Sequence, residues 1–130
     1  MPSEGTNADR PRAGDVAARE VPTCRPTERV SDVAARVASA EWDRCVVINE
    51  ERVVFGLLRS EELRAEGDAT VEEVMRPGPS TFRPHVPIRE MADFMAEHDL
   101  ASAPITTSDG RLVGLLTRGD AERAAKETRK

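Results

Sequence analysis

An internal repeat of 58 residues constrains the fold of this chain more than any other feature of its sequence. Displacing the sequence by 58 positions aligns Pro26 with Pro84 and the Gly-Leu-Leu tripeptide at 56–58 with that at 114–116. Nine of the 50 compared residue pairs are identical, and the alignment needs no gap. A unit of this length is too small to bury both faces of its helices, so the repeat predicts two similar units that pair.

Each repeat is predicted to be a β-α-β-β-α unit. After each proline, apolar residues recur at i, i+3, i+4 and i+7, which is typical of a helix with one buried face. Thr27 is the expected N-cap of the first of these helices, and Pro87 suits the first turn of the second. In the first repeat, the predicted strand pair is Cys45–Ile48 with Val53–Leu58, and the closing helix is Ser60–Ala65. In the second repeat, the strand pair is Ala103–Thr106 with Arg111–Leu116, and the closing helix covers residues 119–126.

The repeat also divides the chain into segments. A polar N-terminal tail covers residues 1–12, the two motifs cover 13–66 and 67–123, and a C-terminal tail covers 124–130. The ends of the tails are polar and are expected to fray. The expected fold class is α+β.

Composition limits the classes of function. With 38% hydrophobic and 33% charged residues the chain is expected to be soluble, and its net charge of -5 argues against binding to nucleic acid. It has neither a long apolar run nor the apolar core of a secretory signal, so the expected location is the cytoplasm, with no membrane partner. Cys24 and Cys45 are expected to be reduced core residues. No metal site is predicted, because neither they nor His85 and His98 have paired ligand spacing.

Three segments of the second repeat carry a family resemblance. They are VEEVMRP at 71–77, PIREMADFMAEHDLASAPI at 87–105 and GRLVGLLTRGD at 110–120. Together they resemble the CBS-domain family, whose cystathionine β-synthase-type motifs occur in tandem as a Bateman module. The resemblance covers about residues 13–123. It implies two motifs that are related by a pseudo-two-fold axis and packed through their sheets, clefts that hold AMP, ADP, ATP or S-adenosylmethionine, and disc-like dimers.

The end of the second repeat is the candidate ligand site. Gly114 allows another group to approach the strand closely, and Thr117 ends that strand with a hydroxyl. By resemblance, Asp120 is the ribose-binding Asp and Thr117 the phosphate-side Thr, while Arg118 and the free N–H groups after Gly119 would face a phosphate. An ordinary capping box also has nearly this spacing, so a purely structural role for Thr117 and Asp120 stays open.

The adenine slot is assigned by the resemblance to the first and second strands of the second repeat. The residues there are Thr81, Phe82, Arg83, Ala103 and Pro104. Small Ala103 and rigid Pro104 suit the wall of a flat pocket.

The first repeat departs from the family pattern at the equivalent positions. Arg59 stands in place of Thr117, and Glu62 in place of Asp120. Arg59 could fill the phosphate position itself or pair with Glu61 or Glu62. The hypothesis is therefore that the first site is weak or self-occupied.

These observations predict a stand-alone regulatory module, active as a homodimer, that senses an adenosine-containing ligand chiefly through its second repeat. Its effector protein is not identifiable from the sequence. The alternative is a ligand-free dimeric assembly module that regulates a separate partner. No enzyme is predicted, because no convergent nucleophile and base, Walker loop or GxGxxG motif is present, and no cofactor is expected besides the regulatory ligand.

Overall fold

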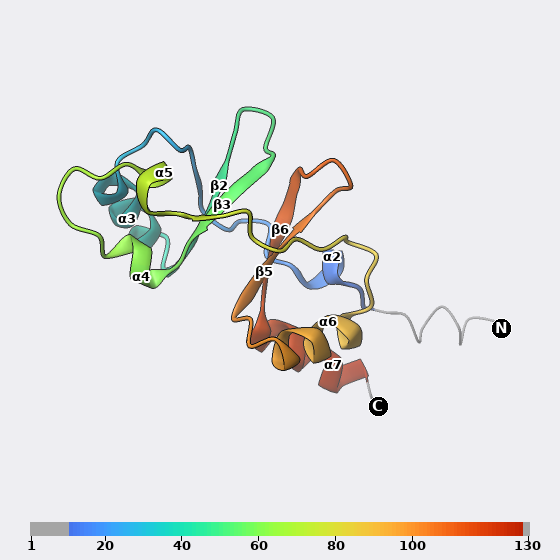
Figure 1. Cartoon of the computed structure of the whole chain (residues 1–130). Helices are drawn as coiled ribbons and strands as arrows, with labels where there is room; N and C mark the ends of the chain where they lie inside the picture. Colours follow the sequence, from blue (N-terminus) through green and yellow to red (C-terminus); the bar gives the residue numbers. More distant parts are fainter. Residues whose placement is uncertain (1–10, 129–130) are drawn as a thin grey trace. The chain divides into compact units, whose positions relative to one another are not determined.

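The computed structural model describes residues 11–128, which form two compact units of mixed α/β structure (Figure 1). The predicted tail residues 1–10 and 129–130 lie outside the described residues. Each unit combines segments that are distant in the sequence. The first-repeat unit comprises 20–79 and 109–112, and the second-repeat unit comprises 11–19, 80–108 and 113–128.

The first-repeat unit is built on a sheet with the strand order β1-β2-β3-β4. β2 pairs in parallel with β1 and antiparallel with β3, which in turn pairs antiparallel with β4. All four residues of β2 are buried, as expected for a central strand of β-branched residues. The elements are β1 (Thr23–Cys24), α3 (Val30–Ser39), β2 (Cys45–Ile48), β3 (Val54–Leu58), α4 (Ser60–Leu63), α5 (Val71–Val74) and β4 (Arg76–Pro77).

The second-repeat unit has the same plan. Its strands β5 (Ser102–Thr106) and β6 (Leu112–Thr117) form a two-stranded sheet. A parallel bridge from Phe82 to Ile105 extends it on one side, and an antiparallel bridge from Ala18 to Leu115 extends it on the other. The helices of this unit are α2 (Ala13–Val16), α6 (Ile88–Glu97) and α7 (Arg118–Thr128), and α6 and α7 lie side by side against the sheet (Figure 1).

Each unit takes its opening helix from the other repeat. In the second-repeat unit, the N–H of Ala13 at the start of α2 donates to the carbonyl of Val86 at 2.8 Å. In the first-repeat unit, the N–H of Val71 at the start of α5 donates to the carbonyl of Glu28 at 2.8 Å. The segments of the two compact units therefore alternate along the sequence, whereas the repeats follow one another.

The central helices and both strand pairs lie within a residue or two of their predicted positions. The N-cap predicted at Thr27 is wrong, because α3 begins at Val30 after Arg29 and has no side-chain cap. A tertiary contact replaces the cap, since the N–H of Val30 donates to the carbonyl of Ala69 at 3.0 Å. At the other end of the chain α7 continues to Thr128, so helix extends into the segment predicted as a C-terminal tail.

Candidate functional site

The candidate site of the second repeat lies where β6 leads into α7. Thr117 is the last residue of β6, and its hydroxyl accepts a hydrogen bond from the N–H of Asp120 at 3.3 Å. A Cβ at Gly119 would meet no atom outside its own helix within 4 Å, so this turn is open on the Gly119 side. The hydroxyl caps one of the free N–H groups at the positive end of an eleven-residue helix.

The charged residues of this turn are all paired. The Asp120 carboxylate accepts a hydrogen bond from Arg123, one turn further along α7, and its side chain keeps 37% of its surface exposed. Arg118 contacts Glu122 at 3.1 Å and Asp99 at 3.4 Å. These are solvent-exposed pairs, which contribute about 0–1 kcal/mol each and exchange readily for other partners.

Gly114 is approached closely by another segment of the same chain. A Cβ at this position would lie 2.7 Å from the carbonyl oxygen of Ala18 and 3.1 Å from the Cβ of Ala17. Ala18 exchanges two backbone hydrogen bonds with Leu115, at 2.9 and 3.0 Å. The absence of a side chain at Gly114 is therefore what allows the segment after α2 to pair with β6.

The residues assigned to the adenine slot are held by the sheet. Phe82 donates its N–H to the carbonyl of Pro104 at 3.1 Å and accepts from the N–H of Thr106 at 2.8 Å. Ala103 is buried in the apolar cluster that β5 forms with α6 and α7. The backbone groups of Phe82 are thus already bonded, and the Ala103 side chain belongs to the core.

Arg83 and Thr81 form a small polar contact next to Phe82. The Arg83 guanidinium donates to the Thr81 hydroxyl at 2.6 Å and also to the carbonyl of Thr107. The ring of Phe82 packs edge-on against that of Phe94 on α6, with the centroids 5.2 Å apart. This region is pre-organised, and Arg83 is anchored at both ends of its guanidinium.

The equivalent turn of the first repeat is closed by an ion pair. Arg59 donates to both carboxylate oxygens of Glu62, at 3.0 and 2.7 Å, and its backbone N–H donates to the same carboxylate at 2.7 Å. Glu61 lies farther from the guanidinium, at 3.8 Å. The hydrogen bonds from Arg59 lower the pKa of the Glu62 carboxyl, whose side chain is only 11% exposed. Of the alternatives left open for Arg59, the structure has the pairing with Glu62.

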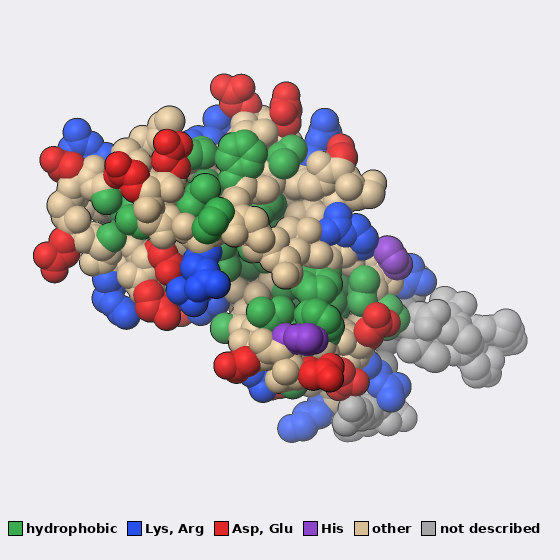
Figure 2. Space-filling model, viewed as in Figure 1, with side chains coloured by type: hydrophobic (Ala, Val, Ile, Leu, Met, Phe, Trp, Pro, Cys, Tyr) green, Lys and Arg blue, Asp and Glu red, His purple; other side chains and the backbone are tan. Residues whose placement is uncertain are grey.

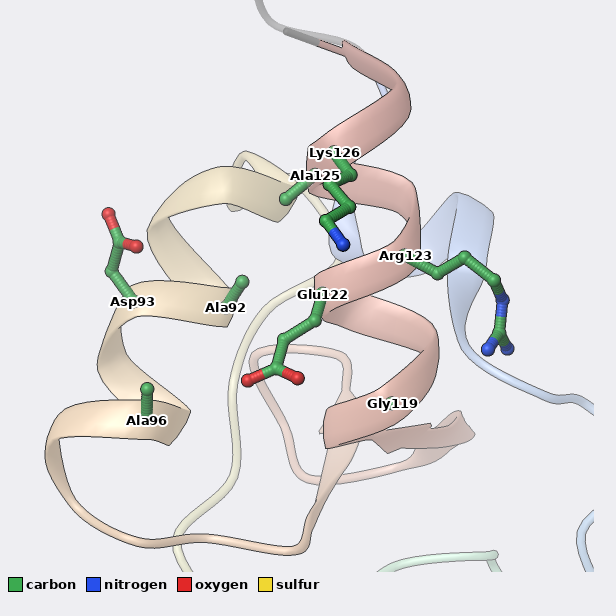
Figure 3. Close-up of a pocket in the computed structure, with 8 residues that line it drawn as sticks. All are labelled: Ala92, Asp93, Ala96, Gly119, Glu122, Arg123, Ala125 and Lys126. Carbon is green, nitrogen blue, oxygen red and sulfur yellow. The ribbon is translucent and has the colours of Figure 1, made fainter.

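A pocket of about 600 Å³ lies between α6 and α7 (Figure 3). Ala92 and Ala96 line it on α6, and Glu122 extends toward α6 from the opposite helix. Its full lining is Ala92, Asp93, Ala96, Gly119, Glu122, Arg123, Ala125 and Lys126. Gly119 is the residue it shares with the ligand site predicted from the sequence.

The sequence reasoning missed two residues that shape the candidate site. Arg123 holds the Asp120 carboxylate, and Ala18 occupies the space beside Gly114. The spacing of three residues on a helix is a signal that could have revealed the first of these pairs. The second has no local signal, because Ala18 precedes Gly114 by most of the chain.

Comparison with known proteins places the chain in a family. The model of the CBS domain matches residues 13–67 and 71–127. This protein belongs to the CBS domain family. The family resemblance seen in the sequence is thereby confirmed, and the two matched CBS domains follow the 58-residue repeat.

Solved CBS-pair structures share the fold. CBSX2 from Arabidopsis thaliana in complex with AMP aligns with a TM-score of 0.81 and 22% identity, over 92% of this chain and 98% of that one. The CBS domain pair of protein MJ0100, in complex with 5′-methylthioadenosine and S-adenosyl-L-methionine, aligns with a TM-score of 0.79 and 19% identity, over 92% and 98% of the two chains. The predicted mixed α/β CBS-pair fold is therefore confirmed.

Among curated relatives, homoserine O-acetyltransferase of Methanohalobium evestigatum is 23% identical over 116 residues, which are 87% of this chain and 24% of the relative. The chain spans between 24% and 59% of the length of the curated relatives it matches. The similarity to the acetyltransferase thus concerns a CBS-sized part of that protein.

Three further features concern the surface, membrane-spanning helices and metal-binding groups. Acidic and basic side chains are interspersed over the face shown in Figure 2. Within residues 11–128, no helix has the length and apolar character needed to cross a bilayer. The same residues contain no group of three or more His, Cys, Asp or Glu side chains that could hold a metal ion.

Proposed function

We propose that this CBS pair is a regulatory module that binds an adenosine-containing ligand chiefly through its second repeat. The observation that carries the proposal is the difference between the two turns. Asp120 is partly exposed at the start of α7 and is held only by the exposed Arg123, whereas Glu62 is engaged by three hydrogen bonds from Arg59. The Asp120 carboxylate of the second repeat is therefore available to a ligand, whereas the Glu62 carboxylate of the first repeat is already bonded to Arg59.

The chemistry of the second turn suits a nucleotide. The Asp120 carboxylate can accept hydrogen bonds from two ribose hydroxyls, which requires only that the exposed Arg123 contact be exchanged. The Thr117 hydroxyl accepts from the N–H of Asp120 and can still donate its own proton to a phosphate oxygen. The start of α7 adds a positive helix end, and Arg118 can leave Glu122 to neutralise a phosphate.

The relatives support the ligand class. CBSX2 and the CBS domain pair of MJ0100 were solved with AMP and with 5′-methylthioadenosine and S-adenosyl-L-methionine, all of which contain an adenosine group. We extend that class to this chain, with AMP, ADP, ATP and S-adenosylmethionine as the candidates. In this proposal the ligand acts by its different affinity for two arrangements of the module, which an effector protein then reads.

The test is thermal unfolding of the protein with each of the four ligands and without ligand. A ligand at 100 times its dissociation constant adds about 2.7 kcal/mol of stability, which raises the melting temperature by several degrees. The shift should vanish in Asp120→Ala and persist in Glu62→Ala, the matched change in the first repeat. Thr117→Ser should keep the shift and Thr117→Ala should weaken it. Equal loss in Asp120→Ala and Glu62→Ala would contradict the preference for the second repeat.

Titration calorimetry complements this test. The closed first turn predicts one strong ligand site per chain, and two equivalent sites would overturn the prediction. Incubation of the protein with the bound nucleotide should leave the nucleotide unchanged, because the proposed role is binding without catalysis.

A second candidate function is a ligand-free dimeric assembly module. Two observations favour it: the Thr117 hydroxyl already caps α7, and the pocket between α6 and α7 has an alanine lining with both acidic and basic side chains around it. A surface of this kind can pair with a copy of itself across a two-fold axis. Sedimentation of the protein and of Ala96→Glu separates the candidates. A dimer that Ala96→Glu dissociates, together with no shift from any of the four ligands, would favour assembly.

A further inference from the structure

The core of the first-repeat unit contains two thiols that the proposed ligand site does not use. Cys24 lies on β1 and Cys45 on β2, and both are reduced and buried, with 3% and 0% of their surface exposed. Both belong to the same apolar cluster, which α3 covers with Val33 and Val37. Because the two thiols lie on neighbouring strands, they are candidates for a reaction with each other.

The register of the two strands places the thiols on one face. Cys24 lies opposite Val47 in the parallel pair, and Cys45 precedes Val47 by two residues, so both side chains point to the same side of the sheet. This offset puts their Cα atoms about 8 Å apart, from a strand separation of about 4.8 Å and a rise of about 3.3 Å per residue. A disulfide requires about 4.4–6.8 Å, so the native register keeps the pair just beyond bonding geometry.

The strand that carries Cys24 is short and lies at the edge of its sheet. β1 has two residues at the edge of the sheet, and the carbonyl of the preceding Pro22 accepts from the N–H of Val46 at 3.0 Å. Arg36 adds a hydrogen bond to the carbonyl of Thr23 at 3.0 Å. A hydrogen bond with the Cys24 thiol, followed by burial, raises the pKa of Cys45, so the native arrangement disfavours the Cys45 thiolate. Local opening of β1 is the step that would expose Cys24 first.

We propose that Cys24 and Cys45 form a redox-sensitive dithiol that closes to an intramolecular disulfide when β1 opens and shifts along β2. The oxidant class is a low-molecular-weight disulfide. The Cys24 thiolate attacks one sulfur of the oxidant and releases the other half as a thiol, which takes up the Cys24 proton. The Cys45 thiolate then attacks the Cys24 sulfur of the mixed disulfide and releases the second half as a thiol with the Cys45 proton. The two cysteines are oxidised by two electrons, and the oxidant is reduced to two thiols.

The shift of β1 distinguishes this disulfide from an inert cross-link. In the reduced protein the N–H of Val46 is bonded to Pro22, and moving Cys24 toward Cys45 breaks that register. The oxidised protein should therefore exchange the Val46 amide hydrogen at least about tenfold faster than the reduced protein. The amide of Leu115, which is bonded to Ala18 in the second-repeat unit, serves as an internal reference and should not change.

The experiment treats the full chain with oxidised glutathione in buffer and in urea below the unfolding transition, and follows intact mass and peptide maps. The expected product has lost about 2 Da, contains a Cys24–Cys45 cross-link and returns to the starting mass with dithiothreitol. Its rate should rise with urea while the protein remains folded, because opening of β1 limits the reaction. The variants Cys24→Ser and Cys45→Ser cannot close the ring, and should stop at a glutathione adduct or stay unreacted.

Two results would overturn the proposal. One is a wild-type protein that gains glutathione, or remains reduced, without any cross-link at every urea concentration at which it is folded. The other is a cross-link that leaves Val46 exchange unchanged. Neither result touches the ligand site, because thermal shifts by nucleotides can be measured on the Cys24→Ser, Cys45→Ser double variant.

Discussion

The two repeats of this CBS pair share a backbone but differ in the turn that leads into the last helix. The displacement of 58 residues that aligns the sequences also maps α3 onto α6 and α2 onto α5, residue for residue. It even maps the unusual backbone angles, since the positive φ of Glu41 recurs at Asp99 and that of Arg52 recurs at Gly110. The repeat therefore conserves the backbone conformation at the turns after α3 and α6 and at the turns of the two strand pairs.

At the candidate site, the same displacement aligns residues with different side-chain chemistry. Arg59 and Glu62 form an ion pair at the start of α4, a helix of four residues with no buried residue. Thr117 and Asp120 stand at the start of an eleven-residue helix that buries Ala121 and Ala125. Of these two turns, the one at the start of α7 is open and stands on a helix with buried residues, which supports the proposal that the ligand binds the second repeat.

The largest expected effect comes from adding a methyl group at the equivalent glycines. Gly114→Ala would place a Cβ 2.7 Å from the Ala18 carbonyl oxygen, and Gly56→Ala would place one 2.6 Å from the Met75 sulfur and 2.9 Å from a backbone oxygen. Both should destabilise the fold by about 1–3 kcal/mol, as over-packing does. Gly114→Ala should be the worse of the two, because its Cβ would lie 2.7 Å from a backbone oxygen, whereas the backbone oxygen next to Gly56 lies at 2.9 Å and the closer Met75 side chain can move aside.

Urea unfolding at pH 7 measures both variants against Gly119→Ala. A Cβ at Gly119 meets no atom outside its own helix within 4 Å, so this change should be neutral or stabilise the helix by up to about 1 kcal/mol. A Gly114→Ala variant as stable as wild type would show that the segment after α2 does not pair with β6 as described.

These positions also show what a sequence can and cannot reveal. The helix at 88–97 and both strand pairs follow from apolar periodicity and turn residues, which are local signals. The pairing of Ala18 with Leu115 and of β4 with β3 depends on contacts between distant or short segments that have no periodicity. The failed N-cap at Thr27 has the same cause, because Ala69 supplies the partner that a local cap would have provided.

The positions of the candidate site residues follow from the sequence to a similar extent. The family motif located Thr117, Gly119 and Asp120 at one turn, and the structure has them together. The partners of these groups were not predictable with the same confidence, because side-chain pairing depends on rotamers and not on spacing alone. The contact of Arg123 with the Asp120 carboxylate is such a pairing, and the ribose-binding role of Asp120 stays a proposal.

A smaller effect is expected on the pH dependence of stability, which should differ between the two turns. Arg59 lowers the pKa of Glu62 below its usual 4.5. The stabilisation from this carboxylate is therefore complete above about pH 4.5 and is lost as the pH falls through the lowered pKa. At pH 7, Glu62→Gln should reduce the free energy of unfolding by about 0.5–1 kcal/mol through the weakened cap, and the difference from wild type should shrink as the pH falls through the lowered pKa of Glu62.

The matched change in the second repeat is Asp120→Asn. Its carboxylate accepts from the exposed Arg123, so the loss at pH 7 should stay within about 0.5 kcal/mol. Chemical denaturation of both variants across pH 3–7 measures the contrast. An Asp120→Asn loss equal to that of Glu62→Gln would mean that the two turns are equally closed, and would weaken the assignment of the ligand to the second repeat.

A further comparison concerns the left-handed residues that follow α3 and α6. Glu41 has φ 64° and Asp99 has φ 54°, a region that disfavours side chains with a Cβ, although Asp tolerates it better than Glu. Glu41→Gly should therefore stabilise the protein by about 0.5–1 kcal/mol. Asp99→Gly should gain less, because it starts from a tolerated residue and also removes the contact with Arg118 at 3.4 Å. Thermal unfolding of both variants tests this ranking. A larger gain at Asp99 would show that the Arg118 contact does not stabilise the second turn, so that Arg118 can be recruited by a ligand without loss.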